Sequence, residues 1–101
     1  MDWVFKQKGE QLLVDADVSI HTAEAFCRAL REQPVRCFDF AAVTIEDGES
    51  MAYVISAIRE MQPVSLIEAP QMLAHGLYKI GALASNDIVL IRPRVDEGQG
   101  A

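Results

Sequence analysis

Three acidic residues near the middle of the chain, Glu46, Asp47 and Glu49, are the first candidates for chemistry. Neighbouring carboxylates shift each other's pKa, and such a pair can serve as an acid and a base in catalysis. Carboxylates also gather where a loop enters a helix, because they accept hydrogen bonds from the free backbone N–H groups of the first turn. We favour this capping role over catalysis, and a role in binding is the remaining alternative.

Other groups that carry chemistry are scarce in the sequence. Cys27 and Cys37 are the only cysteines, and no CxxC motif or Cys/His cluster indicates a zinc site. His21 and His75 lie far apart in the chain, with no Ser or Cys at catalytic spacing. No Gly-rich phosphate loop, GxSxG elbow or HExxH helix occurs either. The sequence therefore predicts no catalytic residue, no metal site and no cofactor, and we expect a protein that is not an enzyme.

Length and charge narrow the class of protein further. The chain has 101 residues, 50% of them hydrophobic, which fits a single folded domain. Its 15 acids and 9 bases give a net charge of −6, which argues against nucleic acid as a partner because phosphate binding needs clustered Lys and Arg. No apolar run reaches the roughly 18 residues of a membrane span, and no signal-peptide pattern is present. We therefore expect a cytoplasmic protein with two buried, reduced thiols.

The hydrophobic pattern predicts strands and helices in alternation along the chain. Short apolar or alternating segments predict strands at 3–6, 11–15, 36–41, 64–67 and 88–91. Apolar residues at helical spacing predict helices at 21–32, at 48–61 and from Pro70 to Gly81. The intervening segment 43–50 is rich in Thr, Asp, Gly and Ser, and we expect it to form a loop.

This order of elements predicts an α/β domain with a mixed sheet of four to five strands and three to four helices. We expect the strand at 36–41 to lie at the centre of the sheet. The domain is expected to comprise residues 1–92. Residues 93–101 lack apolar periodicity and are expected to form a flexible C-terminal tail.

The helix predicted at 48–61 offers a possible docking surface. Its expected buried stripe consists of Met51, Val54, Ile55, Ile58 and Met61. Ala52, Tyr53 and Ala57 fall outside this stripe and could form a small apolar docking face. The alternative is that they are scattered exposed apolar residues, which are normal on protein surfaces.

Four segments in order resemble STAS domains, the family named for sulphate transporters and anti-sigma-factor antagonists. The segment 17–24 (DVSIHTAE) is similar to the entry to the first helix of the family, and 37–44 (CFDFAAVT) resembles its central strand, with Ala41 in place of the usual Ser. The segments 64–70 (VSLIEAP) and 77–83 (LYKIGAL) resemble a later strand, the Pro-started helix and its Gly-x-Leu ending. The resemblance covers roughly residues 10–92 and implies the STAS-like fold.

The resemblance also implies a binding module in place of an enzyme. In the anti-sigma-antagonist branch, a Ser in an Asp-Ser-Ser-Gly loop is phosphorylated, and this breaks the complex with the partner. Here Asp47 matches the Asp of that loop, Gly48 and Glu49 replace the two serines, and Ser50 takes the Gly position. The usual phosphoacceptor is therefore absent in the simplest register, and whether Ser50 or Thr44 receives a phosphate is open. Glu49 either imitates a phosphorylated loop or simply stabilises the helix.

Two functions fit this resemblance. The first is a non-enzymatic regulatory module that binds an anti-sigma factor or a serine-kinase-like protein through residues 47–50 and the following helix. The alternative is a cytoplasmic accessory subunit that packs on the ATPase of a lipid-trafficking ABC transporter, or a chemotaxis-linked STAS protein. For either function we expect a protein partner, no nucleic acid, no membrane insertion, and a monomer or weak dimer.

Overall fold

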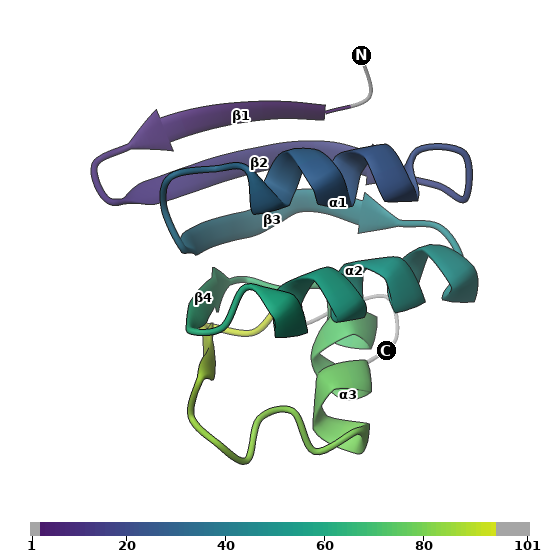
Figure 1. Ribbon diagram of the computed structural model, residues 1–101, viewed down its shortest axis with the longest axis vertical. Helices are drawn as coiled ribbons and strands as arrows, with labels where there is room; N and C mark the ends of the chain where they lie inside the picture. Colours follow the sequence, from purple (N-terminus) through teal and green to yellow (C-terminus); the bar gives the residue numbers. More distant parts are fainter. Residues whose placement is uncertain (1–2, 95–101) are drawn as a thin grey trace.

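A computed structural model describes residues 3–94 of the chain (Figure 1). Within this range the strands are β1 (Trp3–Lys8), β2 (Gln11–Val18), β3 (Cys37–Ile45), β4 (Val64–Ile67) and β5 (Ile88–Ile91). The helices are α1 (Ala23–Arg31), α2 (Gly48–Glu60) and α3 (Gln71–Lys79). The chain is thus an α/β domain, as predicted. No helix of residues 3–94 is long and apolar enough to cross a membrane.

The strands of residues 3–94 form one mixed sheet in the order β1-β2-β3-β4-β5. The hairpin partners β1 and β2 are antiparallel, and every later neighbour pair is parallel. The prediction that the strand beginning near residue 36 is central is confirmed, because β3 lies between β2 and β4. Each parallel step moves to the next strand in the same direction, so right-handed crossovers place α1, α2 and α3 on one face of the sheet (Figure 1).

The hydrophobic core fills the space between this face and the helices. Alternate residues of β2 point into it, from Leu12 to Val18, and Phe38 and Phe40 of β3 do the same. One side of α1 is fully buried against the sheet, through Ala23, Phe26, Cys27 and Leu30. The hairpin closes one end of the core, where the rings of Trp3 and Phe26 meet edge to face with centroids 5.9 Å apart.

β3 is longer than predicted, and the expected loop at 43–50 is confirmed only for Glu46 and Asp47, because 43–45 belong to β3 and 48–50 to α2. Val43 and Ile45 lie opposite Ala16 and Val18 of β2, so the strand continues to the end of its neighbour. Thr44 suggested a loop because of its polarity, but it is the outward-facing residue between two inward apolar ones. The strand therefore carries the chain directly to the start of α2.

Arg94, the last described residue, holds the segment that follows β5 against β3. β4 pairs with β3 only as far as Asp39, which leaves later carbonyl groups on that side of β3 without a ladder partner. The Arg94 guanidinium donates to two of these carbonyl oxygens, those of Phe40 and Val43, the latter at 3.1 Å. The rest of the predicted tail, 95–101, lies outside the described residues.

The two cysteines differ in their environment. Both are free thiols, but only Cys27 is buried, and Cys37 is half-buried. Burial raises the pKa of the Cys27 thiol to about 11 and also raises the pKa of Cys37. The prediction of two buried thiols is therefore wrong for Cys37, which begins β3 on the face of the sheet opposite the helices.

Candidate functional site

The candidate site begins where β3 leads into α2. Asp47 is the N-cap of the helix, and its Oδ1 accepts a hydrogen bond of 2.7 Å from the Ser50 backbone N–H. This bond is the main reason that the Asp47 pKa lies below its ordinary value, because it favours the ionised form. The capping role predicted for Asp47 is confirmed, and Glu49 follows in the first turn, where its charge opposes the helix dipole.

Ser50 is buried at the base of this turn. Ser50 is 0% exposed, and its side-chain Oγ has no hydrogen-bond partner among the described residues. A protein kinase could not reach this hydroxyl without opening the first turn of α2. Thr44, the other hydroxyl in question, is exposed on β3 and donates a hydrogen bond to Asp17 of β2.

The predicted docking face of Ala52, Tyr53 and Ala57 is only partly correct. Ala52 is exposed and Tyr53 is 42% exposed, but Ala57 is 0% exposed and belongs to the core. Because residues of a helix are about 100° apart, Ala57 shares the inner side with Ser50 and Val54. Met51 and Ile55, expected on the buried stripe, are instead only half-buried. The exposed part of the predicted face therefore consists of Ala52 and Tyr53 alone.

A hollow of about 380 Å³ lies beside the start of α2. Its apolar lining comes from β3, α2 and α3, through Ile45, Met51, Ala52, Ile55 and Met72, and its polar rim is Glu46, Asp47 and Gly48. Met72 of α3 is 62% exposed and was not predicted as a site residue. Its position one residue before the buried Leu73 could have indicated an outward side chain next to α2.

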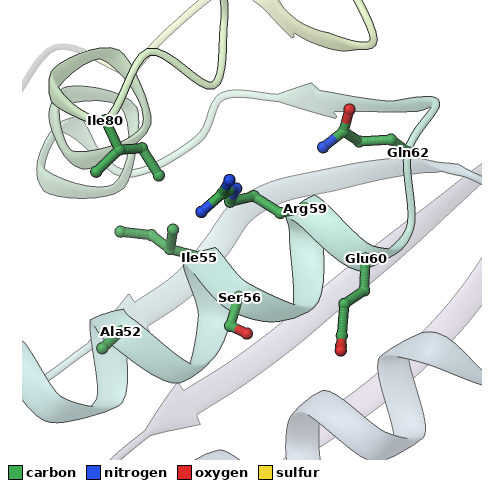
Figure 2. A pocket seen from close by; sticks show the side chains of 7 residues that line it. All are labelled: Ala52, Ile55, Ser56, Arg59, Glu60, Gln62 and Ile80. Carbon is green, nitrogen blue, oxygen red and sulfur yellow. The ribbon is translucent and has the colours of Figure 1, made fainter.

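A broader hollow of about 570 Å³ continues along α2 toward its C-terminal end. Figure 2 shows Arg59 reaching from α2 toward α3, on the side where Ile55 and Ile80 lie. Glu60 points the opposite way, toward α1, where the carboxylate is 2.6 Å from Nη2 of Arg31. This hollow combines apolar side chains with one guanidinium group, a surface suited to contact with another protein.

The remaining candidate groups stay apart. His21 is exposed in the turn before α1, and His75 is exposed on α3. In the part of the chain that the structure describes, no three or more His, Cys, Asp or Glu side chains form a group that could hold a metal ion. What the site brings together is a capped helix start, exposed carboxylates and an apolar hollow.

No family model matches this chain, and no curated protein matches its sequence. The resemblance to STAS domains therefore stays a prediction, based on the four segments of the sequence. The mixed five-stranded sheet described for residues 3–94, with its helices, is consistent with an α/β fold in general.

Proposed function

We propose that this protein is a non-enzymatic regulatory module of the STAS type that binds a partner protein. The partner docks on a surface made by Asp47, Gly48, Glu49, Ala52, Tyr53 and Met72, here called the α2 docking surface. The hollow beside α2 carries this proposal, because it joins apolar side chains, among them the exposed Met72, to the carboxylates of Glu46 and Asp47 within one patch. Apolar anchors surrounded by polar groups are the usual anatomy of a protein interface.

The burial of Ser50 supports a module without the usual phosphorylation switch. The one hydroxyl among residues 47–50 is enclosed in the first turn of α2, whereas Glu49 is exposed. A glutamate side chain carries at most one negative charge, compared with about 1.5 to 2 for a phosphoserine at neutral pH. In this proposal the loop is permanently charged, and the partner recognises that one state.

Site-specific photo-crosslinking in the cells that produce the protein tests this function. A benzophenone side chain placed at Ala52 is expected to capture one partner, while the same group at Ala84, exposed in the segment between α3 and β5, captures none. Mass spectrometry of the product then identifies the partner. An anti-sigma factor or serine-kinase-like protein agrees with the proposal, and a transporter ATPase would select the accessory-subunit alternative. Absence of any product specific to Ala52 would contradict both.

A further inference from the structure

The face of the sheet opposite the helices carries no helix within residues 3–94. The crossovers place all three described helices on one side, so the outward residues of the strands form a surface of their own. Apolar side chains remain exposed there: Val4 is 61% exposed on β1, and Val89 is 44% exposed on β5. Antiparallel hairpins commonly expose such a face, but parallel strands are usually covered on both.

A hollow of about 290 Å³ lies on this bare face, over β1, β2 and β3. It forms where the pairing of β2 with β3 shifts register, between Leu13 and Asp15 on β2. Across the shift, Asp39 Oδ1 accepts a 2.9 Å hydrogen bond from the Ala41 backbone N–H, which holds that carboxylate in place. We call this feature the sheet hollow; its apolar lining is Val4, Leu13, Ala41 and Ala42.

The charge of the sheet hollow is mainly negative. The carboxylates of Asp15 and Asp39 line it, and Lys6 is the one cation in its lining. Within the described chain, neither Asp15 nor Asp39 takes part in an ion pair. The hollow therefore combines aliphatic walls with two carboxylates.

These features identify the chemistry of the occupant. A second copy of this chain that presented the same face would bring aspartates against aspartates, which costs free energy, and the carboxylates exclude a nucleic-acid backbone. An arginine side chain fits both parts of the hollow. Its aliphatic stem can pack on Val4 and Leu13, while its planar guanidinium can hydrogen-bond to carboxylates in the geometry that they favour. We propose that the sheet hollow receives an arginine side chain from an extended segment of a partner protein, at a site separate from the α2 docking surface.

The test uses a capped hexapeptide of alternating Leu and Arg and a matched peptide in which citrulline replaces each Arg. Citrulline has nearly the same shape but no charge. Titration into the full-length protein is followed by the methyl resonances of Val4, Leu13, Ala41 and Ala42. The arginine peptide is expected to shift these resonances saturably, and the citrulline peptide to bind at least about tenfold more weakly. Free N-acetyl-arginine amide is expected to bind more weakly than the peptide, because it lacks the flanking apolar contacts.

Substitutions of the charged residues that line the sheet hollow test whether the peptide binds there. Asp39→Asn keeps the acceptor for the Ala41 N–H, and combined with Asp15→Asn it is expected to raise the Kd at least about tenfold. Lys6→Gln, which removes the like charge, is expected to lower the Kd. Asp87→Asn, exposed just before β5, is the matched control and is expected to leave the Kd unchanged.

Equal affinity of the two peptides, no detectable binding, or an unchanged Kd in the double variant would overturn the proposal. Saturable shifts confined to the residues of the α2 docking surface would also overturn it. Failure to capture a partner at Ala52 would not affect the peptide titration, so each proposal can fail without the other.

Discussion

Replacing Ser50 with Ala is expected to stabilise the protein, although the change removes a polar group from a natural helix. Ser50 is 0% exposed, and its Oγ has no hydrogen-bond partner among the described residues. A buried hydroxyl without a partner costs about 1–3 kcal/mol, because it has lost its hydrogen bonds to water. The Asp47 cap persists in the variant, since its hydrogen bond of 2.7 Å comes from the Ser50 backbone N–H, which Ala also provides.

Part of any gain would come from helix propensity alone, because Ala is favoured over Ser in helices by about 0.5 kcal/mol. Ser56→Ala measures this part, since Ser56 is exposed on the same helix. We therefore expect Ser50→Ala to raise the free energy of unfolding by about 1–3 kcal/mol more than Ser56→Ala does. For a domain of this size, each 1 kcal/mol corresponds to about 4–8 °C in Tm.

Urea unfolding followed by circular dichroism gives the two free energies directly. The reasoning is wrong if Ser50→Ala stabilises no more than Ser56→Ala, because the hydroxyl would then have a partner or access to water. Stoichiometric phosphorylation of wild-type Ser50 in the folded protein, seen by intact mass, would contradict its burial in the same way.

Three further predictions concern the loop and the thiols. The fold lowers the Asp47 pKa, so ionised Asp47 stabilises the protein at pH values above its ordinary pKa of 3.8, and this stability is lost as the pH falls through the lowered pKa. Asp47→Asn keeps a capping side chain but does not titrate. This variant is expected to lose that part of the acid dependence, measured by urea unfolding at several pH values. Glu49→Ser is expected to change partner affinity by about tenfold with little change in Tm, and a change in Tm alone would show that Glu49 only supports the helix. In thiol titration of the native protein Cys37 is expected to react before Cys27, whose reaction should require unfolding; equal rates would contradict the difference in burial.

The fold was predictable from the sequence where apolar runs have clear limits. Val64–Ile67 and Ile88–Ile91 were predicted with the bounds that the structure gives, because each is an apolar segment that follows a residue unfavourable in strands, Pro63 or Asp87. The end of β3 was missed because Thr44 was taken as a loop residue, although Val43, Thr44 and Ile45 alternate as a strand does.

The candidate site was less predictable, because small residues give little indication of which way they face. Ala57 suits an exposed face or a close helix contact equally well, and only the packing against the rest of the fold places it inside. Ser50 was predicted at the junction of the loop at 43–50 and the helix at 48–61, and the sequence did not show that it lies one turn before Val54 on the inner side of α2. The hollow beside α2 also depends on Met72, which comes from α3 and is distant in the sequence.

The most direct test of the proposed function is calorimetry with the partner that is captured at Ala52. The affinity of this partner for the Ala52→Arg variant is compared with its affinity for the Ala84→Arg variant. Both alanines are exposed and receive the same large, charged side chain, but only Ala52 lies on the α2 docking surface. We predict at least about a tenfold loss of affinity for Ala52→Arg, which corresponds to about 1.4 kcal/mol, and no loss for Ala84→Arg. Unchanged affinity of Ala52→Arg, or an equal loss in both variants, would contradict the proposal that this surface binds the partner.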